Sequence, residues 1–437
     1  MFGQPQINLP KFGDGIGLHR IERFFQDKRI DRASLSRRSI VVTGTNGKGS
    51  TARFLTTAIG ATGLKVGCFT SPHLFDVRER FTLGEAMIPK EAFEQHSKTV
   101  LDFNAALPEG DRMGSFEFLF LVAILWFQQE KPDAIVWEAG IGGRYDPVRT
   151  VCALVSTLTS IELEHTELLG STEELIAYDK VDALAPGGTV VLSPGIDARL
   201  AGRIGAFGRL AGKVAVGALA GRRMGAVMST AKGAAFTYAA GEAEYAVELR
   251  LAGLHQAENA VTAVRAAEIW LGARPSEVSA QLPDMLKALA STRWPGRLER
   301  VAHGSDLWID VGHTPRALDM VTKTFLEFVP REQTLVVFGV SAVKEVAQIA
   351  EIVAGRFDHF ILTRALKGGA DPAAFADVFR ARASDVTVEP DIAAAAKLAR
   401  DRAAKERLTV LAVGGLFLAV ETQHAWKGGD LRELEFL

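Results

Sequence analysis

The sequence contains very little cysteine. Among its 437 residues only Cys68 and Cys152 occur, which excludes a scaffold held together by many disulfides. Each cysteine stands beside apolar residues of the kind found in β-strands. We therefore expect two buried thiols in a reducing compartment rather than a disulfide or a metal site.

Long apolar runs are also missing. The most hydrophobic stretch, residues 116–127, is interrupted by Glu117 and is too short to cross a bilayer, so it is predicted to be a core helix. The N-terminus lacks the charged and apolar regions of a signal peptide. These absences predict a cytoplasmic protein without a membrane partner.

Neither sign of charge is in excess. The formal net charge is −2 and no basic stripe with interleaved aromatic residues is present, so nucleic acid is a poor candidate partner. With 48% hydrophobic and 23% charged residues, the composition is that of an ordinary globular protein. The length predicts two or three domains.

The chain is organised around residues 40–51, Ile-Val-Val-Thr-Gly-Thr-Asn-Gly-Lys-Gly-Ser-Thr. A predicted strand, a glycine loop and an apolar helix from Thr51 would present backbone N–H groups to a phosphate chain. Lys48 can reach terminal phosphate oxygens, and Ser50 can place a hydroxyl on Mg²⁺. Val42 replaces the first glycine of the common Walker pattern, and Gly49 separates the lysine from the serine. These residues favour a nucleotide site over a plain glycine turn, with these predicted members: Gly44, Thr45, Asn46, Gly47, Lys48, Gly49, Ser50 and Thr51.

Polar residues follow three further predicted strands. Ser71 and His73 follow the second strand, Glu138 and three glycines the third, and His165 the fourth. In open parallel α/β sheets the carboxyl ends of the strands form the ligand-binding edge. A carboxylate followed by glycines suits a Mg²⁺-nucleotide site. For His165, the residues alone leave a metal ligand and a surface histidine as alternatives.

Strand and helix patterns alternate along the rest of the chain. Predicted strands are residues 40–43, 65–70, 134–137, 152–159, 188–192, 307–311, 334–339, 357–363, a short one near 386, and 409–413, with a hairpin at 83–85. Residues 13–26 are predicted to pass from a glycine loop into a helix. Further predicted helices are residues 90–106, 115–129 and 172–184, and others beginning near 253, 315, 344, 372 and 392. His19 and Arg20 of the first helix are expected to face solvent, with the lining of a cleft as the alternative.

Two α/β domains are predicted from this alternation. Residues 1–290 form a doubly wound nucleotide-binding domain that includes a small β-rich segment at residues 197–250. Residues 291–437 form a second, smaller α/β domain.

Six stretches resemble the folylpolyglutamate synthase/dihydrofolate synthase family, a branch of the Mur ligases. They are residues 43–50, 70–73, 138–144, 255–260, 295–299 and 310–315. The resemblance implies a Mur-ligase-like fold, in which a P-loop ATP-binding domain precedes a Rossmann-like C-terminal domain that binds the amino acid. It also implies a monomer whose partners are small molecules.

The family joins an amino acid to a carboxylate by way of an acyl phosphate made from ATP. By matching motifs, the resemblance implies that Lys48 binds the β- and γ-phosphates and that Ser50 binds one Mg²⁺ ion. Ser71, Glu138 and His165 would hold a second Mg²⁺ ion. The activity implied first is the addition of L-glutamate to dihydropteroate or a reduced folate.

Five further residues receive roles from the same resemblance. Lys180 matches a lysine that family members often carry as a carbamate. Asn259 and Arg297 would contact ATP, and Asp310 would contact its ribose. His313 would lie at the incoming amino acid.

Several positions depart from the family pattern. The altered positions are Val311, Thr314, the segment Val343-Lys344-Glu345, Gly415, Glu162 and Glu164, and residues 145–149. A polar site that loses one hydrogen-bonding partner can change its discrimination by orders of magnitude. Two alternatives therefore stay open: the same ligase chemistry on a non-folate carboxylate or with another amino acid, and an ATP-binding homologue without turnover.

Overall fold

The computed structural model describes residues 9–10, 13–274, 277–301, 306–341 and 346–434. Its larger lobe is built on an eight-stranded sheet in the order β4-β3-β2-β5-β1-β6-β7-β8. The β2–β3 and β3–β4 pairs are antiparallel and the other neighbours are parallel. The strands are β1 Ser39–Thr43, β2 Val66–Phe69, β3 Phe81–Leu83, β4 Ala86–Met87, β5 Ala134–Glu138, β6 Val155–Leu158, β7 Thr189–Leu192 and β8 Val214–Gly217.

Helices cover both faces of this sheet. Alternate residues of β1 point to opposite sides: Ile40 and Val42 pack with α3 and α9, whereas Val41 packs with α1 and α5. Burial on both faces is the normal environment of a parallel strand and explains why β1 is an unbroken apolar run. The helices of this lobe are α1 Leu18–Asp27, α2 Arg32–Arg38, α3 Lys48–Gly60, α4 Lys90–Ala105, α5 Ser115–Glu130, α6 Thr166–Leu169, α7 Glu173–Val181, α8 Ala198–Leu210, α9 Leu254–Trp270 and α10 Leu282–Ala288.

The predicted starts of helix α3 and of strand β6 are each wrong by three residues. Helix α3 begins at Lys48 rather than Thr51, because Gly47 adopts a left-handed conformation (φ 83°) and caps the helix three residues earlier. Strand β6 begins at Val155 rather than Cys152, because Cys152 has φ 54° in the turn that ends a 3₁₀ helix. Cys68 is buried as predicted, whereas Cys152 is only partly buried.

The predicted β-rich segment 197–250 is a separate sheet only in its second half. Residues 198–210 form helix α8, and β8 extends the large sheet instead. The antiparallel sheet itself contains β9 Arg222–Met224, β10 Met228–Thr230, β11 Gly233–Ala240 and β12 Ala243–Leu249. Its buried residues join the core formed by α3 and α9.

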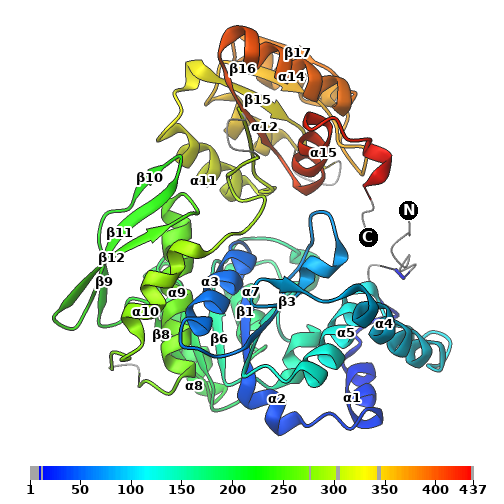
Figure 1. Cartoon of the computed structure of the whole chain (residues 1–437), viewed down its shortest axis with the longest axis vertical. Helices are drawn as coiled ribbons and strands as arrows, with labels where there is room; N and C mark the ends of the chain where they lie inside the picture. The colour runs from blue at the N-terminus through cyan, green and yellow to red at the C-terminus, as the bar shows by residue number, and fades with distance from the viewer. Residues whose placement is uncertain (1–8, 11–12, 275–276, 302–305, 342–345, 435–437) are drawn as a thin grey trace.

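The second lobe is a six-stranded sheet in the order β13-β14-β18-β15-β16-β17, parallel except for β13. Figure 1 shows it, coloured yellow to red, above the larger lobe. Its strands are β13 Glu299–Arg300, β14 Leu307–Ile309, β15 Thr334–Phe338, β16 His359–Leu362, β17 Asp385–Val388 and β18 Thr409–Val413. Helices α11 Pro315–Leu326, α12 Val346–Ala354 and α13 Ala376–Arg380 cover one face, and α14 Ile392–Glu406 and α15 Leu416–Trp426 cover the other.

The predicted α/β class is confirmed in both lobes, with differences in detail. The helix expected from Pro372 is a 3₁₀ turn followed by the short α13. The helix expected from Lys344 begins outside the described residues. The division of the chain at residues 290 and 291 stays a prediction.

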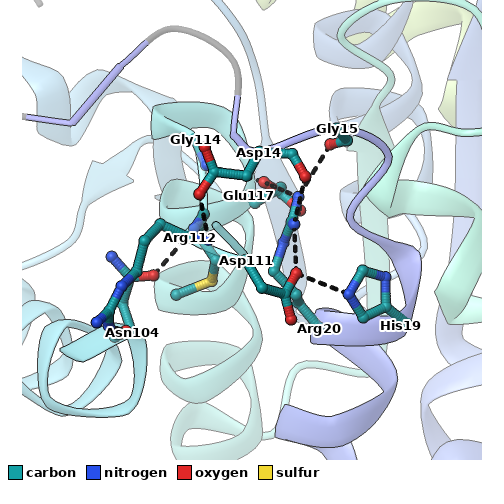
Figure 2. Close-up of polar contacts among 10 residues, drawn as sticks. Asp14, Gly15, His19, Arg20, Asn104, Asp111, Arg112, Gly114 and Glu117 are labelled. Atoms are coloured by element: carbon teal, nitrogen blue, oxygen red, sulfur yellow. Dashed lines mark hydrogen bonds and ion pairs between the residues drawn. The ribbon is translucent and has the colours of Figure 1, made fainter. Parts of the chain in front are cut away.

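Arg20 is buried, so the prediction that it faces solvent is wrong. Its guanidinium donates to Glu117 and Asp111 and to the carbonyls of Asp14 and Gly15, as Figure 2 shows. Because a buried charge needs partners, the loop folds over the arginine instead of exposing it. His19, which lies next to it, is exposed as expected.

Among the residues that the structure describes, none of the helices combines the length and the apolar character needed to cross a lipid bilayer.

Candidate active site

The glycine loop between β1 and α3 is held in a conformation that requires glycine at two positions. Gly44 has φ 139°, and a Cβ atom there would lie 1.9 Å from the Thr159 hydroxyl oxygen. Gly47 has φ 83°, and its Cβ would lie 2.6 Å from Oδ1 of Asn259. The loop therefore passes directly against β6 and α9, with no room for side chains.

The loop is fixed to the segment that follows β6. The Thr45 amide donates to the Ser160 carbonyl (2.8 Å), and the Asn46 amide donates to the Ser160 hydroxyl (2.8 Å). In return, the Thr159 hydroxyl donates to the Asn46 carbonyl at 2.6 Å. Asn46 also donates through Nδ2 to Glu162 Oε1 (2.6 Å). Two loops distant in sequence thus behave as one rigid edge.

The N-terminus of α3 offers groups suited to an anion. Gly47 caps this helix without a side-chain hydrogen bond, so the N–H groups of the first turn face the loop. Lys48 lies in that turn and donates to the carbonyls of Gly44 (3.0 Å) and Thr45 (2.8 Å). Ser50 is buried and lines the adjacent pocket. The positive end of the α3 dipole, the Lys48 ammonium group and the Ser50 hydroxyl therefore all lie at the start of this helix.

Glu138 lies at the end of β5, next to the loop that follows β2. Its Oε2 accepts from the Ser71 amide at 2.9 Å. The Ser71 hydroxyl accepts from Arg80, which also donates through Nε to Nδ1 of His73. Burial raises the pKa of the Glu138 carboxyl to about 7, although Lys48, the Ser71 amide, Arg297 and Arg80 pull the other way. A carboxylate in this state would be stabilised by a nearby cation.

Lys180 is buried in α7 and donates to the Gly44 carbonyl at 3.0 Å. Burial, followed by the positive charge of Lys48, lowers the pKa of the Lys180 amine to about 7. The preceding residue, Asp179, accepts from the amides of Gly143 and Arg144 in the turn after Glu138. Helix α7 is therefore fixed to both the glycine loop and the Glu138 turn.

A pocket joins the two lobes above the glycine loop. It has about 650 Å³ of empty space, its open mouth included. Its walls bring together six of the residues predicted to contact nucleotide or metal: Asn46, Gly47, Ser50, Asn259, Arg297 and Asp310. Nε of Arg297 is buried without a hydrogen-bond partner among the described residues. An anionic ligand in this pocket would supply that partner.

Asp310 and His313 differ in how they meet the site. Asp310 is buried and accepts from the amides of Leu298 (2.8 Å) and Gly312 (2.7 Å), and burial raises its pKa. His313 is half-exposed, with Nε2 3.7 Å from Oε1 of Glu164. It is not part of the pocket lining.

The predicted second metal set is only partly assembled. Ser71 and Glu138 are in contact, while His165 stands at the start of α6 with its Nδ1 3.8 Å from Oε1 of Glu167. Within the described part of the chain, no group of three or more His, Cys, Asp or Glu side chains could hold a metal ion. The predicted set contains a serine and only two such residues, so it stays a prediction.

Several pocket residues were missed at the sequence level. Arg316 and Met320 of α11 line the pocket from the second lobe, and His255 and Glu258 line it beside Asn259. Burial, followed by the charge of Arg297, lowers the pKa of His255 to about 4, so its ring is neutral. Pro315 indicates the start of a helix, and residues four apart lie on the same face of a helix. These two signals could have placed Arg316 and Met320 side by side from the sequence.

Comparison with known proteins agrees with this geometry. Residues 296–416 match the family described as "Mur ligase, glutamate ligase domain". The chain is 32% identical over 396 residues to a probable bifunctional folylpolyglutamate synthase/dihydropteroate synthase of Halobacterium salinarum, covering 89% of this chain and 47% of that protein. It is 28% identical over 345 residues to the dihydrofolate synthase/folylpolyglutamate synthase of Bacillus subtilis, covering 77% of each.

Solved structures share the fold. The structure of Mycobacterium tuberculosis folylpolyglutamate synthase with ADP and AMPPCP superposes with a TM-score of 0.82 at 24% identity, covering 95% of this chain and 96% of that chain. The chain spans about half the length of the first curated relatives it matches, 47% and 46%.

Proposed function

The chain belongs to the folylpolyglutamate synthase/dihydrofolate synthase family of Mur ligases, and from this membership we propose that it is an ATP-dependent ligase. Its reaction joins the amino group of an amino acid to a carboxylate, forming an amide by way of an acyl phosphate. The first pair of substrates we propose is L-glutamate with dihydropteroate or a reduced folate. The observation that carries the proposal is the pocket that places Ser50 and Asn46 of one lobe opposite Arg297 and Asp310 of the other.

The residues in and beside the pocket suit the negative charge of a nucleoside triphosphate. The first turn of α3 and Lys48 provide donors for phosphate oxygens, and Arg297 has a buried donor atom to give. The buried Asp310 carboxylate can accept from ribose hydroxyl groups, as the resemblance implied. ATP is therefore the proposed co-substrate, with Asn259 lining the same pocket beside the glycine loop.

Ser50, Ser71, Glu138 and His165 are the residues we propose to hold Mg²⁺. The fit depends most on Glu138, whose buried carboxylate has a raised pKa and accepts a hydrogen bond from the Ser71 amide. Bound Mg²⁺ would neutralise phosphate charge as the phosphoryl group moves.

The proposed chemistry has two steps. An oxygen of the substrate carboxylate attacks the γ-phosphorus of ATP, and ADP leaves. The neutral amine of the amino acid then attacks the acyl carbon, phosphate leaves, and the amine loses a proton. Lys48 and Arg297 stabilise the negative charge that develops during the phosphoryl transfer.

We also propose that Lys180 is carbamylated. Carbamate formation requires a neutral amine, which attacks CO₂ and releases a proton. Burial supplies that amine near pH 7, since it lowers the pKa of Lys180 to about 7. The resulting anion would lie close enough to Lys48 to compensate its positive charge.

A second candidate keeps the chemistry and changes the amino acid. Gly415 replaces a serine that the family pattern carries, and a Cβ at this glycine would lie 4.0 Å from Cβ of His313. A hydroxyl is thus missing beside the histidine that we place at the amino acid. This position favours a test of amino acids other than glutamate.

Phosphate release identifies the substrates. Purified protein would be assayed with ATP, Mg²⁺ and bicarbonate on dihydropteroate or tetrahydrofolate, each with a panel of amino acids, and the products would be weighed by mass spectrometry. We expect release with glutamate and a product heavier by one glutamyl unit. Turnover only with another amine would establish the second candidate.

One variant at the phosphate-binding loop and one surface control test the role of Lys48. Lys48→Ala should abolish phosphate release, whereas Lys98→Ala, which changes an exposed lysine on α4, should not. A protein that binds no ATP would overturn the ligase proposal. We further propose that the chain acts in the cytoplasm as a monomer and that its partners are these small molecules.

A further inference from the structure

Two of the departures from the family pattern contact each other. Glu162 follows β6 in the first lobe, and Thr314 precedes α11 in the second lobe. The Thr314 hydroxyl donates to Oε2 of Glu162 at 3.3 Å. Asn46 of the glycine loop connects the same pair, since its Nδ2 lies 2.6 Å from Oε1 of Glu162 and 3.1 Å from the Thr314 hydroxyl. We call these three residues the Glu162 bridge.

The hydroxyl at the centre of the bridge uses all of its bonding capacity. Thr314 caps α11 by accepting from the Ala317 amide at 3.2 Å. It also accepts from Asn46 and donates to Glu162. One donor and two acceptor sites are all that a hydroxyl has, so this set satisfies it completely. Thr314 is buried, where such satisfaction counts most.

The bridge joins two parts that are rigid by themselves. On the first lobe, the Glu162 amide donates to the Thr45 hydroxyl, and the neighbouring backbone is bonded to the glycine loop. On the second lobe, Thr314 begins the helix whose residues Arg316, Ala317 and Met320 line the nucleotide pocket. The bridge therefore connects the glycine loop to the start of α11 and fixes the position of this helix at the pocket.

A second contact runs beside the bridge. Glu164 lies 3.7 Å from Nε2 of His313, again across the two lobes. Glu162 thus contacts Thr314, and Glu164 lies near His313, the residue just before it in the second lobe. The segment after β6 carries both carboxylates, so one short segment aligns the amino-acid side with the nucleotide side.

We infer that Glu162 is a positioning residue that holds α11 and His313 against the glycine loop. This inference rests on the proposed ligase function and deepens it. Glu162, which the family pattern lacks at this position, would couple the nucleotide site to the amino-acid site at His313. Both carboxylate oxygens of Glu162 take part in the bridge, one through Asn46 and the other through Thr314.

Double-mutant kinetics tests the bridge. Glu162→Ala and Thr314→Val should each lower kcat/KM for ATP about tenfold, the effect of losing a hydrogen bond to a charged group. The double variant should also lose about tenfold rather than a hundredfold, because either change breaks the same contact. Thr314→Ser and the surface change Glu173→Ala should leave the value near that of the wild type. Losses that multiply in the double variant would overturn the inference.

Hydrogen–deuterium exchange gives a readout that does not require turnover. In the nucleotide-free protein, Glu162→Ala should speed exchange of the amides in the first turn of α11, although the substitution lies in the other lobe. Glu162→Gln keeps one oxygen acceptor and should give an intermediate rate. Unchanged exchange on α11 would refute the bridge even if the ligase activity is present. A protein with no ligase activity but with faster exchange would refute the proposed function alone.

Discussion

Arg20 shows how one buried side chain can organise a loop. Its guanidinium is fully buried and makes bonds to both oxygens of Glu117, to Asp111 and to two backbone carbonyls (Figure 2). A Cβ on Gly17 would lie 1.3 Å from Oε1 of Glu117, so the loop is in direct contact with the pair. The loop and the start of α5 are therefore one unit.

Removing this arginine should be costly. Arg20→Met leaves the carboxylate of Glu117 buried without its partner, and we expect the free energy of unfolding to fall by about 3–5 kcal/mol. Urea titration followed by circular dichroism measures the loss. Arg23→Met, on the exposed side of the same helix, is the control. Adding Glu117→Leu to the first variant should restore part of the stability, and no restoration would show that the ion pair is not the cause.

Lys180 should make the activity depend on pH and on bicarbonate together. Burial and the charge of Lys48 lower the pKa of its amine from 10.5 to about 7. The protonated form dominates below pH 7 and the neutral, carbamate-forming amine dominates above it. At a fixed CO₂ concentration, activity should rise between pH 6 and pH 8 and then level off.

A second buried lysine supplies the control for this prediction. Lys213 is buried and paired with Asp182 at 2.7 Å. Lys180→Arg should remove both the bicarbonate dependence and most of the activity, whereas Lys213→Arg should retain the dependence. A carbamate signal in ¹³C nuclear magnetic resonance of the wild type, absent from Lys180→Arg, would identify the group. Equal bicarbonate dependence in the two variants contradicts the proposal.

Helix α3 contains two glycines with different surroundings, Gly49 in a tight contact and Gly60 in open space. A Cβ on Gly49 would lie 2.9 Å from the ring of Trp294, a residue of the segment that leads into the second lobe. A Cβ on Gly60, at the other end of the helix, would meet nothing within 4 Å. The extra glycine between Lys48 and Ser50 is therefore explained by packing against Trp294.

The same substitution should change stability with opposite sign at the two ends of α3. Gly60→Ala should raise the free energy of unfolding by about 0.4–1 kcal/mol, because alanine restricts the unfolded chain. Gly49→Ala should lower it by about 1–3 kcal/mol, because the methyl group overpacks against the indole. Thermal unfolding of both variants measures the difference. Two changes of the same sign would show that Trp294 does not restrict this position.

The sequence could predict elements better than their contacts. β1 was predictable because a β-branched run and a glycine loop are local signals. The burial of Arg20 was not, since it depends on Glu117 and Asp111, which lie more than ninety residues away. Helix α8 was missed because its glycines and alanines give a weak apolar period. The Glu162 bridge likewise needs three segments that only the fold brings together.

At the scale of the whole molecule, the two lobes meet in one ligand pocket. The first lobe contributes Asn46 and Ser50, and the second contributes Asp310 and Arg316. Leu74 of the first lobe also packs into the apolar core of the second. A ligand that fills this pocket is bound by both lobes, so its binding energy should stabilise both at once.

Calorimetry with a nucleotide analogue tests that coupling. Saturation with Mg²⁺ and AMPPNP at a hundred times the dissociation constant should add about 2.7 kcal/mol to the free energy of unfolding and move the whole unfolding transition upward. Arg297→Met removes the Nε donor, which has no hydrogen-bond partner within the described part of the chain. The analogue should then stabilise only the first lobe, and the transition should split in two. Arg293→Met, an exposed change in the same connecting segment, should behave like the wild type. A single, fully shifted transition in Arg297→Met would mean that both lobes are still stabilised without this side chain, and the role assigned to Arg297 in coupling the second lobe to the nucleotide would then be wrong.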